Sequence, residues 1–114
     1  MTTIYYNPAC SKCRQTLQLL RERQMECEVV EYLKTPTSRA ALERILGMLK
    51  SEPTALVRRD KRFQELGLRD EDYSTSTQVT DLLLAHPELM ERPIVVHDGR
   101  AVIARPPERV LEIL

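Results

Sequence analysis

The pattern of apolar and polar positions changes period near the start of the chain. Residues 4–6 are a β-branched and aromatic run that ends at Asn7-Pro8, which predicts a strand followed by a turn. After Cys10 the apolar positions take helical spacing, at Cys13, Leu17 and Leu20. Cys10 is therefore expected at a junction between a strand and a helix.

A second strand is predicted over residues 25–33, which alternate loosely and end before Pro36. The two predicted strands enclose one helix. Such a strand–helix–strand unit implies parallel strands joined by a right-handed crossover.

Helical periodicity dominates the middle of the chain. Apolar residues recur every three or four positions from Ala41 to Leu49, after the start signal Pro36-Thr37-Ser38. Thr75 with Gln78 three residues later is a capping-box signature. The predicted helices run from the first start signal through Leu49, from Pro53 through Arg58, from about Asp60 to Leu66-Gly67, and from Thr75 to His86-Pro87.

The last part of the chain predicts a hairpin and a final helix. Residues 94–97 and 100–104 flank Asp98-Gly99, a pair that favours a type I′ turn. Pro106-Pro107 then starts a helix with apolar positions at Val110, Leu111 and Leu114. We therefore predict an α/β fold: a mixed four-stranded sheet with a helical insertion between the second and third strands.

Length and composition narrow the class of protein. The 114 residues are 42% hydrophobic and 30% charged, which fits a single globular domain over residues 1–114. The longest aliphatic run, residues 82–85, is far shorter than the roughly 20 residues of a membrane span. We expect a cytoplasmic protein that does not contact membranes.

The charge balance argues against nucleic acid as a partner. Seventeen Lys and Arg balance seventeen Asp and Glu, and there is no Trp, so no basic and aromatic surface is expected. No heptad repeat is visible, and a monomer is expected.

Cys10 carries the clearest chemistry in the sequence. A thiol reacts as its thiolate, and an ordinary cysteine with a pKa of about 8.5 is mostly protonated at neutral pH. The first turn of a helix stabilises a thiolate, because unpaired N–H groups and the helix dipole face the sulfur. The same N–H groups can hold an oxyanion beside it. We therefore favour a nucleophilic role for Cys10 over a packing role.

Cys13 lies within reach of Cys10 across one helical turn. The spacing fits a reversible disulfide, and the position on the apolar helix face fits a packed thiol equally well. The other candidate ligands, Cys27, His86 and His97, lack the spacing of a zinc site, so no metal is expected.

Three arginines, Arg58, Arg92 and Arg105, are distinguished by their positions. Each is expected at the end of an element, where a loop can bring it toward the Cys10 turn. Arginine presents a planar fork of donors that suits tetrahedral oxyanions. The three side chains are therefore candidate binding residues for such an anion.

Several blocks together resemble the glutaredoxin-coupled arsenate reductases, over essentially the whole chain. They are residues 4–14 with Thr16-Leu17, and residues 32–36, 56–59, 65–68, 86–89, 92–96 and 105–114. The resemblance implies a thioredoxin-like fold with a helical insertion, in agreement with the element order predicted above. By analogy with thioredoxin folds, the Arg92-Pro93 bond is expected to be cis.

The resemblance also implies a mechanism. The Cys10 thiolate attacks arsenate, or a similar oxyanion, held by Arg58, Arg92 and Arg105. Glutathione is the co-substrate that attacks the arsenic–cysteine adduct, and glutaredoxin helps to discharge arsenite. No tightly bound cofactor is implied.

Two positions depart from many members of that family. Tyr6 stands where they have histidine, and Cys13 stands where they have a residue that cannot form a disulfide. A CxxC at this place resembles the related Spx-type regulators, which sense thiol oxidation and bind the RNA polymerase α subunit. The alternative function is thus a regulator with a Cys10–Cys13 disulfide switch. A third hypothesis is a general thiol–disulfide reductase.

Overall fold

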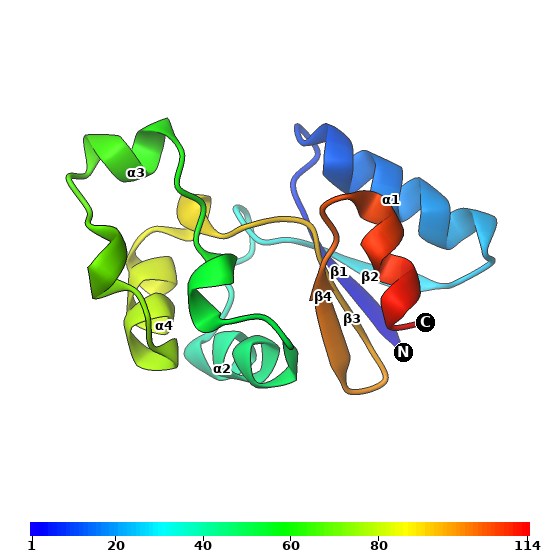
Figure 1. Cartoon of the computed structure of the whole chain (residues 1–114). Coiled ribbons are helices and arrows are strands. Elements are labelled where there is room, and N and C mark those ends of the chain that lie inside the picture. The colour runs from blue at the N-terminus through cyan, green and yellow to red at the C-terminus, as the bar shows by residue number, and fades with distance from the viewer. The chain divides into compact units, whose positions relative to one another are not determined.

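In the computed structural model, which describes residues 1–114, four strands form one mixed sheet in the order β2-β1-β3-β4 (Figure 1). The strands are β1 (Thr2–Tyr6), β2 (Cys27–Glu31), β3 (Ile94–His97) and β4 (Arg100–Ile103). β1 and β2 are parallel, and β3 is antiparallel to both β1 and β4. The predicted mixed sheet and its parallel crossover are confirmed.

The backbone is organised as two units. The first unit joins residues 1–35 to residues 92–114 and contains the whole sheet. The second unit, residues 36–91, contains only helical elements and short connections. It is the helical insertion that the sequence predicts between the second and third strands.

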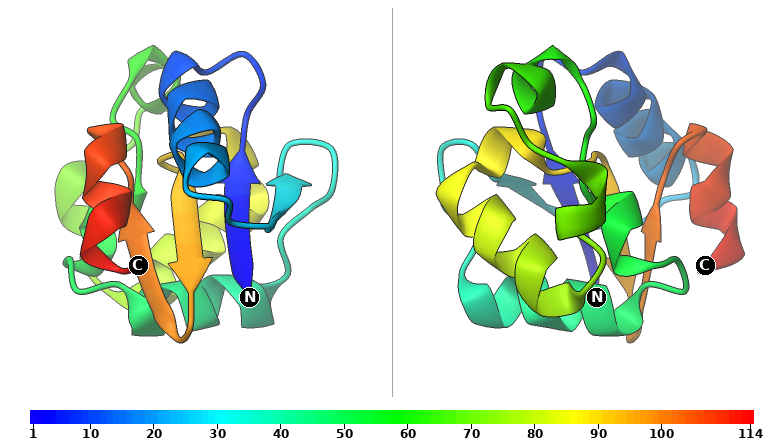
Figure 2. Two further views of the ribbon diagram at one scale, coloured as in Figure 1. Left: turned by 90° about the vertical axis from the view of Figure 1, so that its right-hand side faces the viewer. Right: turned by 60° about the vertical axis from the view of Figure 1, so that its left-hand side comes forward.

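In the first unit, helix α1 (Ser11–Glu22) and the 3-10 helix η4 (Pro107–Glu112) lie side by side on one face of the sheet (Figure 2). Their apolar side chains and those of the strands form one core: Ile4, Leu17, Leu20, Val95, Val102, Ala104, Val110 and Ile113. Each large aliphatic side chain buried in this way contributes about 1.5–3 kcal/mol. This core fixes α1, and with it the cysteine that precedes α1, against the sheet.

The hairpin between β3 and β4 follows the prediction. Asp98 and Gly99 have φ values of 47° and 77°, as a type I′ turn requires at both central positions. The final helix differs from the prediction, because it is a 3-10 helix with three residues per turn. Its buried positions are therefore spaced by three, at Pro107, Val110 and Ile113. Leu111, expected on the apolar face, is 40% exposed.

The second unit begins its helices at side-chain caps. Its elements are α2 (Arg39–Met48), η1 (Pro53–Leu56), α3 (Lys61–Glu65), η2 (Asp70–Asp72), α4 (Ser76–Ala85) and η3 (Pro87–Leu89). Ser38 caps α2, Asp60 caps α3, and Thr75 forms the predicted capping box with Gln78 at the start of α4. These caps explain why local sequence signals locate the helix starts.

The helix that begins at Pro53 is shorter than predicted. It ends at Leu56 instead of continuing through Arg58. Val57 is extended and forms a β-bridge with Met90, and the Arg58 N–H donates to the Leu89 carbonyl at 2.7 Å. Pairing with a distant segment thus ends the helix, which no local pattern reveals.

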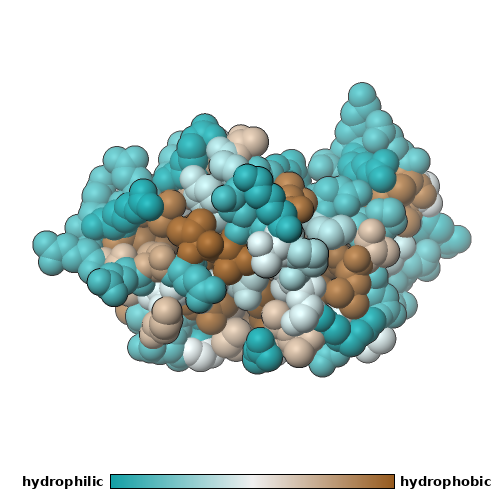
Figure 3. All heavy atoms as spheres, turned by 180° about the vertical axis from the view of Figure 1, so that it is seen from behind, coloured by the Kyte–Doolittle hydropathy of each residue, from teal (hydrophilic) through white to brown (hydrophobic).

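Most of the surface in view in Figure 3 is hydrophilic, and apolar residues show in small patches between polar ones. The large apolar side chains that are exposed are far apart in the sequence: Met1, Val29, Leu33, Leu84 and Leu111. None of the helices has the length and apolar character of a membrane span.

Candidate active site

The first two strands end together and bring two residues to one edge of the sheet. Tyr6 of β1 is paired with Glu31 of β2. The next residue on each strand, Asn7 and Tyr32, therefore leaves the sheet at the same edge. In parallel pairs this carboxyl edge is where binding sites usually form.

The other two strands bring two arginines to the same edge. β3 is antiparallel to β1 and starts with Ile94 opposite Tyr5, so Arg92 lies just before the sheet at this edge. Arg105 follows β4, and its Nη1 donates to the Arg92 carbonyl at 2.8 Å. Both are therefore brought to the place where the Cys10 loop begins.

The Asn7-Pro8-Ala9-Cys10 loop is held by its own hydrogen bonds. The Asn7 side-chain oxygen accepts from the Ala9 N–H at 3.0 Å, and the Asn7 carbonyl accepts from the Cys10 N–H at 2.9 Å. Arg14 of α1 donates to the Pro8 carbonyl at 2.7 Å. Cys10 thereby becomes the N-cap residue of α1, with extended backbone angles.

The environment of Cys10 favours its thiolate. Burial raises the pKa of the thiol, but the Cys13 N–H, the Arg92 guanidinium, the Cys13 thiol and the Lys12 N–H together outweigh burial and lower the pKa to about 7. No acidic residue lies in the first turn of α1 to oppose this. The thiolate of Cys10 is therefore formed more readily at neutral pH than that of an ordinary cysteine.

Two of the three predicted arginines lie beside the Cys10 sulfur. Arg92 is half-buried and its guanidinium lowers the pKa of Cys10, and Arg105 is exposed, with Nη1 at 3.9 Å from Sγ of Cys10. The Arg92-Pro93 bond is cis, as expected, and the Arg105-Pro106 bond is cis as well. A nucleophile with two guanidinium groups beside it can attract and attack a small anion.

Cys13 is a buried, protonated partner of Cys10. Both thiols are free. Burial raises the pKa of Cys13 to about 12, the Asn7 backbone opposes this, and the adjacent Cys10 thiol adds to it. Cys10 therefore ionises more readily than Cys13.

Arg58 belongs to the second unit. Its Nε lies 3.5 Å from an Asp60 oxygen, and its side chain is 26% exposed. It is not among the residues of the first unit that surround Cys10.

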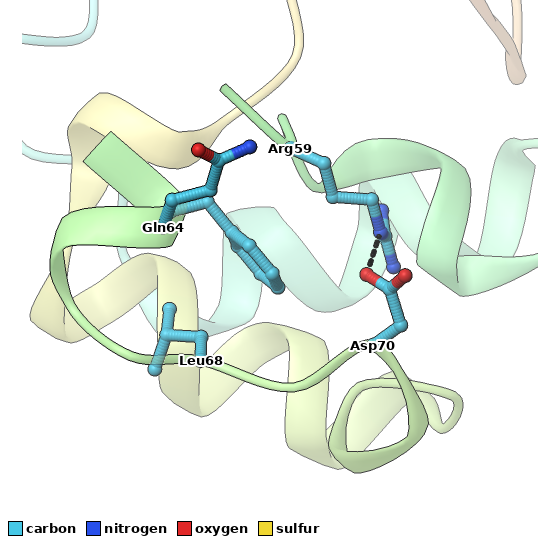
Figure 4. A pocket seen from close by; sticks show the side chains of 5 residues that line it. Arg59, Gln64, Leu68 and Asp70 are labelled. Atoms are coloured by element: carbon cyan, nitrogen blue, oxygen red, sulfur yellow. Dashed lines mark hydrogen bonds and ion pairs between the residues drawn. The ribbon is translucent and has the colours of Figure 1, made fainter. Parts of the chain in front are cut away.

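The neighbouring Arg59 is already committed to structural contacts. It donates to Asp70 at 2.7 Å (Figure 4). It also donates to the Val57 carbonyl at 2.8 Å and hydrogen-bonds to Thr54. Its guanidinium lies over the ring of Phe63. Arg59 lines a shallow pocket with Phe63, Gln64, Leu68 and Asp70, which contains no thiol. Of the two adjacent arginines, Arg58 is therefore the better candidate for an anion.

Sequence reasoning missed Tyr32 as a site residue. Its side chain is 1% exposed. Burial raises the pKa of its phenol to about 12, Arg92 opposes this, and the thiols of Cys13 and Cys10 add to it. The available signal was topological, because the residue after the second parallel strand must lie near the residue after the first.

The pKa of Cys10 leads to a prediction on reactivity. Alkylation by iodoacetamide should follow the thiolate, with a rate that rises with pH and has a midpoint near 7. The rate is measured by intact-mass spectrometry between pH 5 and 10. In Cys10→Ser the remaining thiols, Cys13 and Cys27, should react slowly, since burial raises the pKa of both. A midpoint of about 8.5 or above in the wild-type protein would contradict the assigned environment.

The side chains show no cluster of three or more His, Cys, Asp or Glu that could hold a metal ion. The chemistry available at this edge is that of a thiolate, a second thiol, guanidinium groups and a phenol.

Comparisons with known proteins identify the family. The ArsC family matches residues 5–113. The uncharacterised protein YfgD of Escherichia coli (strain K12) is 46% identical over 97% of this chain and 94% of its own length. An arsenate reductase of the same strain is 41% identical over 98% of this chain and 79% of its own length. The structure of an arsenate reductase from Vibrio cholerae has a TM-score of 0.89 and 41% identity, covering 99% of this chain and 97% of that chain. With its thioredoxin-like fold and helical insertion, the chain belongs to the ArsC family.

Proposed function

We propose that the protein is an arsenate reductase in which the Cys10 thiolate attacks arsenate or a similar tetrahedral oxyanion. The observation that carries this proposal is the placement of the Cys10 thiol at a helix start, where its pKa is lowered, with Arg92 and Arg105 beside it. The relative from Escherichia coli named arsenate reductase supports the choice of anion.

In this proposal the arginines bind the anion and then stabilise its reaction. Arg92 and Arg105 hold arsenate oxygens against Cys10, and Arg58 supplies a third guanidinium. The thiolate forms a sulfur–arsenic bond, and one arsenate oxygen leaves as water after protonation. Donors fixed before the reaction stabilise the developing charge without reorganisation, which is the largest catalytic effect in many enzymes.

Two electrons must then reach arsenic. We propose glutathione as co-substrate: it attacks the arsenic–cysteine adduct, and glutaredoxin helps to discharge the product. One arsenate and two glutathione thiols give arsenite, glutathione disulfide and water. The resemblance of the sequence blocks to glutaredoxin-coupled reductases supports this reductant.

The test is arsenate-dependent oxidation of NADPH in the presence of glutathione, glutaredoxin and glutathione reductase. The proposal expects NADPH consumption that saturates with arsenate. If consumption is the same with and without arsenate, for any concentration of glutaredoxin, the proposed activity is wrong.

A second candidate function is a redox-sensing regulator, favoured by the contact between the Cys13 and Cys10 thiols. Peroxide would oxidise the two thiols to a disulfide and be reduced to water. A regulator of this kind would bind RNA polymerase differently in its two redox states.

Replacing Cys13 by serine separates the two candidates. In a switch, mild peroxide should lower the wild-type mass by about two hydrogens, reversibly with dithiothreitol, and Cys13→Ser should not show this loss. In the reductase proposal, Cys13→Ser keeps arsenate turnover within about threefold, because Cys10 and the arginines remain. Wild-type protein that forms only a glutathione adduct on Cys10 argues against the switch.

A further inference from the structure

A buried hydroxyl lies at the same sheet edge as the nucleophile. Tyr32 is the residue directly after β2, beside the start of the Cys10 loop. Its side chain is 1% exposed, its hydroxyl oxygen is buried with the Arg92 guanidinium nearby as a donor, and no group of the protein accepts the hydroxyl proton. The groups that act on this phenol are the Arg92 guanidinium and the thiols of Cys13 and Cys10. The unpartnered hydroxyl is therefore part of the cluster around the nucleophile.

An unpartnered hydroxyl in this position is unfavourable for folding. Most buried polar atoms in folded proteins have a hydrogen-bond partner, and an atom without one loses its hydration uncompensated. Phenylalanine would fill the same volume without this loss. Because this hydroxyl lies beside the nucleophile, an anion bound there can supply the acceptor that the protein does not.

We propose that Tyr32 is a further residue of the anion site, whose hydroxyl donates a hydrogen bond to an oxygen of the anion bound at Cys10 and Arg92. This inference rests on the proposed function. The donated bond adds to those from the guanidinium groups, and it strengthens as negative charge builds up on that oxygen.

The protonation state of the phenol suits this role. Because burial raises the pKa of Tyr32 to about 12, the hydroxyl keeps its proton throughout the range in which Cys10 ionises. No imidazole competes with it within the first unit: His97 lies at the hairpin end of β3, and its Nδ1 is 2.8 Å from the Thr2 hydroxyl.

The test is Tyr32→Phe, which removes the hydroxyl and keeps the ring. Binding is read without turnover, from the protection of Cys10 against iodoacetamide by increasing phosphate or arsenate. We expect anion affinity and kcat/KM for arsenate each to fall by about ten- to a hundredfold, the usual effect of losing one hydrogen bond to a charged group. The rate of Cys10 alkylation without anion should stay the same. The melting temperature of the variant should stay the same or rise.

Thr80→Val is the matched control. Thr80 is also 1% exposed with an unpartnered hydroxyl, but it lies on α4 of the second unit. The Thr80→Val substitution should leave anion affinity and turnover unchanged. If phosphate or arsenate protects Cys10 in the Tyr32→Phe variant at the same concentrations as in the wild-type protein, the inference is wrong. Wild-type protein that binds the anions but does not reduce arsenate would refute the proposed function alone. Absence of protection in the wild-type protein would refute both.

Discussion

Replacing Cys10 by serine is expected to lower arsenate-dependent turnover by roughly a thousandfold or more, to the background rate. A serine hydroxyl does not ionise near neutral pH, so it does not form the covalent adduct with arsenic that glutathione attacks. The pKa of the wild-type Cys10 thiol is lowered to about 7, so the substitution removes an activated nucleophile. The measurement is NADPH consumption in the coupled assay, beside direct determination of arsenite.

The fold should survive this substitution. Cys10 is the N-cap residue of α1, and serine is preferred at that position. Circular dichroism and the melting temperature should therefore be unchanged or slightly improved. Cys27→Ser is the matched control, because Cys27 begins the edge strand β2 and should leave turnover intact. A folded Cys10→Ser protein that still reduces arsenate would rule out the nucleophile assigned here.

Replacing Arg92 by alanine is expected to lower kcat/KM for arsenate by about a hundred- to a thousandfold. Arg92 has two tasks in this account, since it stabilises the Cys10 thiolate and binds the anion that the thiolate attacks. The midpoint of the iodoacetamide pH profile should therefore move up in the same variant. Arg92→Lys should restore part of the charge effect but little of the binding, because an ammonium group lacks the planar fork.

Arg100→Ala is the control for Arg92. Arg100 is exposed and begins β4 at the hairpin, at the opposite end of the strand from Arg105. The same charge is removed from the same unit, so a general effect of net charge would appear in both variants. Equal losses in the two variants, or a Cys10 profile that does not move in Arg92→Ala, would contradict the role given to Arg92.

Local sequence signals predict the helix starts and the hairpin turn, because interactions between residues close in sequence determine them. The caps at Ser38 and Thr75 and the Asp98-Gly99 turn bond to residues within three or four positions. The end of the helix that begins at Pro53 is predicted wrongly because a distant segment determines it. Val57 leaves the helix after Pro53 because it pairs with Met90.

The candidate site divides in the same way. Cys10 is predictable, because a strand end, a turn and a helix start are all encoded within a few residues. The two arginines beside it, Arg92 and Arg105, stand out by position, and the strand register brings them to the sulfur. Tyr32 is not predictable from its neighbours, because its burial and its proximity to Arg92 depend on how the four strands are ordered.

The contrast between Cys10 and Cys13 also needs the tertiary structure. Spacing alone treats the two thiols as equivalent partners. Burial separates them, with a pKa of about 7 for Cys10 and about 12 for Cys13. Cys10 therefore ionises far more readily than Cys13, which makes it the attacking sulfur in any of the proposed reactions.

The most direct test of arsenate reduction through Cys10 is to measure the arsenite formed by the wild-type protein with arsenate, glutathione and glutaredoxin. We expect one arsenite for each NADPH consumed, and both arsenite formation and NADPH consumption should be lost when Cys10 is replaced by serine. NADPH consumption without arsenite, or arsenite formation that does not depend on Cys10, would contradict arsenate reduction through Cys10.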